Sequence, residues 1–132
     1  MEIYLTEYRE KTDSKKFLKK IISQKLGVYE EQLEFSYSMH GKPFLKNYPA
    51  IHFNLSHTVD MLIIVIADKP VGVDIEKINH GKDEARLLQI AKRFFTENEN
   101  CYINEDEGCR VEKFYEIWIR KEAYVKCIGG SL

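Results

Sequence analysis

One short stretch, residues 71–77 with the sequence VGVDIEK, constrains this chain more than any other. Its alternation predicts a strand whose apolar residues point to one face, while Gly72, Asp74 and Glu76 point to the other. Carboxylates two residues apart on a strand have Cα atoms about 7 Å apart, so both can bind one hard cation such as Mg²⁺. The glycine leaves room for a ligand to approach the backbone. The alternative is the solvated edge of a half-exposed strand.

A second stretch, residues 114–126, has the spacing of a helix with one apolar stripe. Glu122 falls on that stripe, where a carboxylate needs a cation or a hydrogen-bond partner. Lys126 follows one turn later on the same side. If both face Asp74 and Glu76, the four side chains form a site for Mg²⁺ and phosphate. The alternative for Glu122 and Lys126 is an ordinary helix ion pair, which stabilises little. The stripe consists of Phe114, Trp118, Glu122 and Val125.

These two stretches and three others resemble the motifs of the larger, surfactin-synthetase-activating type of 4′-phosphopantetheinyl transferase. The other three are HGKPFL at residues 40–45, HFNLSHT at residues 52–58 and AKRFFTENE at residues 91–99. All five occur in the order of the family, and the resemblance extends from about Lys15 to the C-terminus. It implies an enzyme that transfers the 4′-phosphopantetheine arm of coenzyme A to a serine of an apo acyl or peptidyl carrier protein. The reaction would depend on Mg²⁺ and release adenosine 3′,5′-bisphosphate.

The resemblance also implies roles for individual residues. Asp74, Glu76 and Glu122 would hold Mg²⁺, or Mn²⁺, because oxygen ligands suit both ions. Asp74, Glu122 and Lys126 would carry catalysis: Glu122 takes the proton of the carrier serine, and Lys126 stabilises the leaving phosphate. The residues expected to bind coenzyme A are Lys42, Pro43, Ser56, His57 and Arg9.

Pattern and resemblance together predict an α+β fold with an antiparallel sheet and about three helices. Residues 61–67 form a continuous apolar run, typical of a central strand buried on both faces. Residues 51–55 alternate and precede that run by a short linker, which predicts a hairpin. Residues 96–109 are polar and weakly patterned, which predicts a mobile loop. Further strands are expected at residues 2–8 and 32–37, and helices from residue 13 or 14 to Gly27, at 83–95 and at 114–126.

Length and composition narrow the class of protein. A chain of 132 residues suits a single domain, which the resemblance divides into halves at about 1–69 and 70–132. The net charge of −1 gives no basic field for nucleic acid. We expect neither a membrane span nor a signal peptide, because no long apolar run and no basic N-terminal region occur. Three cysteines without framework spacing indicate reduced thiols and a cytoplasmic protein.

Two other functions fit the same carboxylates. A Mg²⁺-dependent phosphoesterase or nuclease would use water as nucleophile, although the lack of a basic stripe counts against nucleic acid. A truncated relative would bind coenzyme A or a carrier protein without turnover.

The family continues past the lysine helix into further strands, whereas this chain ends at Leu132. We therefore expect either a homo-oligomer that covers the bare apolar surface, or a marginal monomer that frays at residues 124–132.

Overall fold

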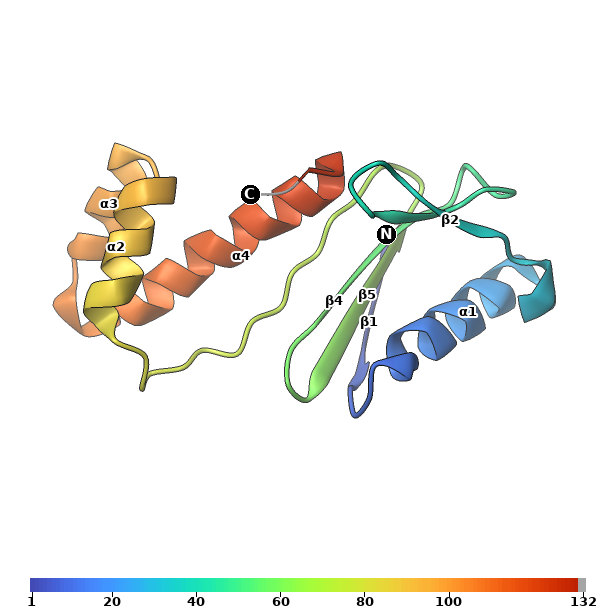
Figure 1. Ribbon diagram of the computed structural model, residues 1–132, viewed down its shortest axis with the longest axis horizontal. Coiled ribbons are helices and arrows are strands. Elements are labelled where there is room, and N and C mark those ends of the chain that lie inside the picture. Colours follow the sequence, from blue (N-terminus) through green and yellow to red (C-terminus); the bar gives the residue numbers. More distant parts are fainter. Residues whose placement is uncertain (131–132) are drawn as a thin grey trace.

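The computed structural model describes residues 1–130, and its strands form one three-stranded and one two-stranded antiparallel sheet (Figure 1). Residues 131–132, part of the end expected to fray, lie outside the described residues. The strands are β1 (Glu2–Glu7), β2 (Phe35–Tyr37), β3 (Pro43–Leu45), β4 (His52–His57) and β5 (Met61–Ala67). The helices are α1 (Thr12–Leu26), α2 (Glu84–Phe94), α3 (Glu97–Asn104) and α4 (Arg110–Ile128), with 3₁₀ turns η1 (Glu30–Gln32) and η2 (Glu107–Cys109). The predicted α+β class is confirmed.

The larger sheet has the order β1-β5-β4, so the apolar run of β5 occupies the centre as predicted. Because side chains alternate along a strand, one face of β5 presents Leu62, Ile64 and Ile66, which pack with α1 in a first hydrophobic cluster. The helix ends as expected at Gly27, whose φ of +66° favours glycine. It begins at Thr12, one residue before the predicted start, and Asp13 Oδ2 accepts from the amides of Arg9 and Glu10 before the helix.

A second hydrophobic cluster is formed by α2, α3 and α4, and it draws no residue from the first half of the chain. Phe95, Phe114 and Trp118 stack at its centre. Figure 1 shows α2 and α3 beside the N-terminal part of α4, whose C-terminal end reaches back toward β2. The two clusters are therefore separate cores. The contacts that connect them determine whether a site can form between them.

The predicted strand at residues 71–77 is wrong: this segment forms no ladder with another strand. Its amides bond to side chains instead, from Val73 N to Asn54 Oδ1 at 2.9 Å and from Ile75 N to Ser56 Oγ at 3.3 Å. Asn54 and Ser56 pair with Val65 and Ile63, on the face of the sheet opposite α1. The segment is thus extended across a face of β4, where polar side chains replace the backbone partners that a strand would need.

The polar stretch at residues 96–109 also differs from expectation, because it contains α3 and η2 rather than a mobile loop. A capping box begins α3: Thr96 Oγ1 accepts from Glu99 N at 3.2 Å, and Glu99 Oε2 accepts from Thr96 N at 2.8 Å. The described residues therefore hold four α-helices, one more than predicted. None of the helices within residues 1–130 is long and apolar enough to cross a bilayer.

Candidate functional site at the junction of the two clusters

A partly buried ion pair connects the two clusters. We call residues 68–83, between β5 and α2, the linker. The surroundings of the pair, which we call the junction, consist of Asn54 and Ser56 of β4, Asp74 of the linker, and Lys126 of α4. The Asp74 side chain is only 6% exposed, and its Oδ1 accepts from Lys126 Nζ at 2.6 Å. Ser56 Oγ donates to the same oxygen at 3.0 Å and accepts from Lys126 Nζ at 3.0 Å. Three elements that are distant in sequence thus meet at one carboxylate.

The face of β4 opposite α1 explains how the linker is held in place. Asn54 and Ser56 lie two residues apart and are both buried, so they share that face. Their side-chain oxygens accept hydrogen bonds from the amides on either side of Asp74, which fixes the backbone that carries the carboxylate. Asn54 was not among the predicted site residues, although its i, i+2 spacing from Ser56 indicates two polar groups on one face of a strand.

Gly72 lets the linker approach α4 without a side chain between them. A Cβ built on Gly72 would lie 1.9 Å from the Ala123 carbonyl oxygen and 2.5 Å from Cys127 N. These are backbone atoms of a helix, which move little. The glycine was expected to leave room for a ligand; the structure shows that α4 fills this room. The close approach brings the linker within reach of Lys126.

Two further carboxylates, Glu76 and Glu122, lie in the electrostatic field of Asp74. Burial raises the pKa of Glu76, and Asp74 raises it further. Burial likewise raises the pKa of Glu122, again with a contribution from Asp74, while Lys126 opposes the shift. Like charges held together in this way favour either protonation or a bound cation.

The junction fits a hard divalent cation by the chemistry of its donors. Asp74 Oδ2 is buried and accepts no hydrogen bond from any described residue, which leaves one oxygen free to bind a cation. The three carboxylates supply only oxygen ligands, the type that Mg²⁺ prefers. Residues 1–130 contain no group of three or more His, Cys, Asp or Glu side chains already arranged around one point. Some side-chain movement is therefore needed before all three can bind one ion.

A first prediction concerns the repulsion at the junction. A group whose pKa is raised by folding contributes stability below its unfolded pKa and loses it as pH rises through the folded pKa. Glu76→Gln should therefore be more stable than the wild type near neutral pH without divalent cation, and the difference should vanish as the solution is acidified. Thermal melting of both proteins from pH 7 to pH 4 measures this. Glu97→Gln, at an exposed site in α3, is the control. A constant difference across this range would contradict the repulsion.

A small groove of about 210 Å³ opens beside the junction. Its lining includes Lys42, from the turn between β2 and β3, Pro43, the first residue of β3, and Lys126 of α4. Two residues expected to bind coenzyme A thus share a groove with the lysine expected to meet its phosphates. The remaining lining residues are His40, Gly41, Asn54, Leu55, Gly129 and Gly130.

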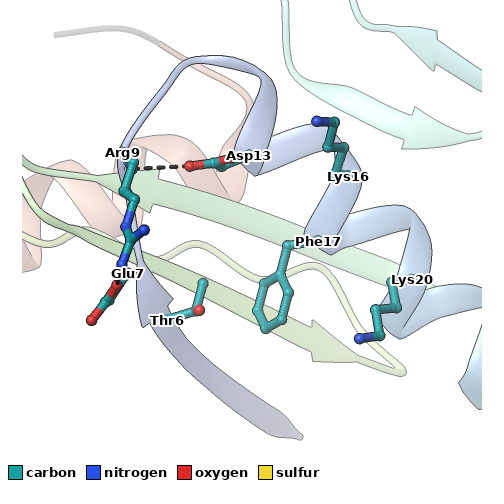
Figure 2. A pocket seen from close by; sticks show the side chains of 7 residues that line it. All are labelled: Thr6, Glu7, Arg9, Asp13, Lys16, Phe17 and Lys20. Atoms are coloured by element: carbon teal, nitrogen blue, oxygen red, sulfur yellow. Dashed lines mark hydrogen bonds and ion pairs between the residues drawn. The ribbon is translucent and has the colours of Figure 1, made fainter.

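The other two predicted binding residues, His57 and Arg9, have different surroundings. His57 pairs with Leu62, so it points to the α1 face of the sheet, where its ring stacks on Tyr8 with centroids 4.2 Å apart. Arg9 is exposed and ion-paired to Glu7 at 2.7 Å. Figure 2 shows Arg9 in a separate pocket between β1 and α1. The other residues that line this pocket are Thr6, Glu7, Asp13, Lys16, Phe17 and Lys20. The structure does not bring Arg9 to the junction.

Comparison with known proteins points to one family. The model of the 4′-phosphopantetheinyl transferase superfamily matches residues 70–132. The chain is 35% identical over 116 residues to the 4′-phosphopantetheinyl transferase gsp of Aneurinibacillus migulanus, covering 87% of this chain and 46% of that protein. It is 32% identical to the 4′-phosphopantetheinyl transferase Sfp of Bacillus subtilis, with coverages of 87% and 50%. The transferase HetI of a Nostoc species is 31% identical, with coverages of 98% and 56%. The chain spans about half the length of these relatives.

Proposed function

Because this chain belongs to the 4′-phosphopantetheinyl transferase superfamily, we propose that it transfers the 4′-phosphopantetheine arm of coenzyme A to a serine hydroxyl of an apo acyl or peptidyl carrier protein. The observation that supports this most strongly is the partly buried Asp74–Lys126 pair beside the groove of Lys42 and Pro43. It combines a carboxylate oxygen that accepts no hydrogen bond within residues 1–130, an ammonium group and an adjacent groove, which are the parts that a pyrophosphate substrate requires.

In this proposal the serine oxygen attacks the β-phosphorus of coenzyme A, and the bond to the leaving phosphate breaks. Adenosine 3′,5′-bisphosphate is the other product. Lys126 lies at the groove and uses two of its three N–H donors on Ser56 and Asp74, so one remains for an anionic oxygen. Glu122, whose raised pKa makes it a better base than an ordinary glutamate, takes the proton of the serine.

Asp74, Glu76 and Glu122 would hold Mg²⁺, which neutralises charge on the pyrophosphate when it is bound. Ser56 and Asn54 then hold Asp74 in the orientation in which it can bind the ion. Ser56 donates to Asp74 Oδ1 and thereby leaves Oδ2 for the ion. A carboxylate fixed by a second group in this way is typical of metal sites. Mn²⁺ is the alternative ion, since it accepts the same oxygen ligands.

A loading assay tests the function directly. The chain is incubated with coenzyme A, Mg²⁺ and an apo carrier protein, and the mass of the carrier is measured. We expect the carrier to gain one phosphopantetheine group, and not to gain it when Mg²⁺ is chelated or when the carrier serine is changed to alanine. Release of phosphate or nucleotide without a carrier would instead indicate a phosphoesterase. Binding of coenzyme A without loading would indicate a non-catalytic relative.

A second prediction concerns the nucleotide end of coenzyme A. If His57 donates to the 3′-phosphate, His57→Ala should weaken the binding of coenzyme A by about tenfold. This is the lower end of the range of affinity that one charge-assisted hydrogen bond contributes, and we expect the lower end because the ring is exposed. Binding of 3′-dephospho-coenzyme A should change little. Calorimetric titration measures both ligands, and His80→Ala, at another exposed histidine, is the control. Equal losses for the two ligands would reject this role.

A further inference from the structure

We propose that Lys42 is a positioning residue, whose ammonium ties the turn between β2 and β3 to both the linker and the end of α4 and so holds Lys126 at Asp74. This inference rests on the proposed function, and it gives Lys42 a role other than binding coenzyme A. Lys42 Nζ donates to the Val71 carbonyl oxygen at 3.0 Å and to the Cys127 carbonyl oxygen at 3.1 Å. One side chain from the first half of the fold thus binds two backbone segments of the second half.

Among residues 1–130, no backbone amide is found donating to the Val71 or the Cys127 carbonyl group, so the Lys42 ammonium is the donor that both receive there. Cys127 lies in the last turn of α4, where carbonyl groups have no amide of the next turn to accept from. A cation there also interacts favourably with the helix dipole. Val71 lies in the linker, which pairs with no strand among the described residues. Burial lowers the pKa of Lys42, because the ammonium group is partly withdrawn from water.

The positions of the two carbonyl groups connect Lys42 to the catalytic pair. Cys127 is the residue after Lys126, and Val71 lies three residues before Asp74. Gly72, which lies between Val71 and Asp74, already approaches the backbone of α4 at Ala123 and Cys127. The two hydrophobic clusters share no residue, so no common core holds the linker against α4. Lys42 therefore supplies a polar contact at the place where the pair would otherwise be free to separate.

Two measurements on Lys42→Met test this role, because methionine keeps the length of the side chain without its charge or donors. In steady-state loading assays, kcat should fall roughly ten- to hundredfold, the loss expected when catalytic groups shift by about 1 Å, while KM for coenzyme A changes little. Amide hydrogen exchange should accelerate at Val73, Ile75 and residues 126–130 and stay unchanged in β5. Lys42→Arg should restore both values, because guanidinium can donate to both carbonyl oxygens.

Lys46→Met is the matched control, since Lys46 is an exposed lysine just after β3; it should leave both measurements unchanged. If Lys42→Met does not fold, Lys42→Gln replaces it, because the shorter neutral amide cannot reach both carbonyl groups. A raised KM with unchanged kcat would overturn the proposal in favour of ligand binding. Unchanged exchange at the linker and α4 would also overturn it, even in a chain that does not load carrier proteins. Failure of the wild type to load would instead reject the proposed function.

Discussion

Asp74→Asn should lower the rate of carrier loading by about a hundredfold or more, which is the usual effect of removing one preorganised electrostatic group from an active site. The substitution keeps the shape of the side chain and its ability to accept from Ser56, but it removes the charge that pairs with Lys126 and the proposed cation. Because Lys126 remains 30% exposed, water can solvate its ammonium. The free energy of unfolding should therefore fall by only about 1–3 kcal/mol, and the protein should stay folded.

Mass spectrometry of the carrier protein measures the rate, and circular dichroism confirms that the variant is folded. Asp68→Asn is the matched control, because Asp68 is an exposed aspartate six residues earlier at the start of the same linker; it should load at the wild-type rate. If folded Asp74→Asn protein loaded a carrier at a near-normal rate, with Mg²⁺ as the only divalent cation, the assignment of Asp74 would be wrong.

Gly72→Ala is expected to separate the linker from α4 and to cost stability as well as activity. Its new Cβ would overlap the Ala123 carbonyl oxygen and Cys127 N, at 1.9 Å and 2.5 Å. Overpacking of this kind typically costs about 1–3 kcal/mol and occasionally more, and here the obstacle is helix backbone. Movement of the linker would carry Asp74 away from Lys126, so loading should be lost together with part of the unfolding free energy. Urea denaturation and the loading assay measure the two effects.

Gly108→Ala provides the control for the loss of a glycine in general. A Cβ at Gly108 would meet no described atom closer than 3.5 Å, an ordinary contact, and its φ is not in the left-handed region. Its stability and activity should remain close to those of the wild type. A Gly72→Ala protein as stable and as active as Gly108→Ala would show that the close approach of linker and helix is not required for the site.

The parts of the fold that could be predicted are those whose pattern is set by burial. The apolar run of β5 has to be covered on both faces, so it predicts a central strand, and the stripe around Phe114 and Trp118 predicts α4. The linker could not be predicted in this way. Its alternation is the same as that of a strand, but Asn54 and Ser56 provide side-chain acceptors for its amides. A sequence pattern does not show whether an amide is bound by backbone or by side chain.

The roles of the candidate site residues remain predictions, and their geometry could be seen only in the structure. The motifs named Ser56, Asp74 and Lys126, which the structure brings into one hydrogen-bonded group. They could not show that Lys42 donates to carbonyl groups of the linker and α4, because such contacts depend on how segments that are distant in sequence are placed in the fold. The stacking of Tyr8 on His57 was missed for the same reason: the two rings come together only through the pairing of three strands. The spacing of Thr96 and Glu99 is that of a capping box, but the polar residues around them indicated a loop, so α3 was not predicted.

The central claim is that the junction of the two clusters binds coenzyme A and Mg²⁺. Amide chemical-shift mapping of the isotope-labelled chain, titrated with coenzyme A and Mg²⁺ together, tests it most directly. The account predicts that the largest shifts fall at Lys42, at residues 54–57, at residues 73–76 and at residues 126–130. Shifts confined to the pocket of Arg9, Lys16 and Lys20 between β1 and α1 (Figure 2), or no shifts at saturating ligand, would contradict it.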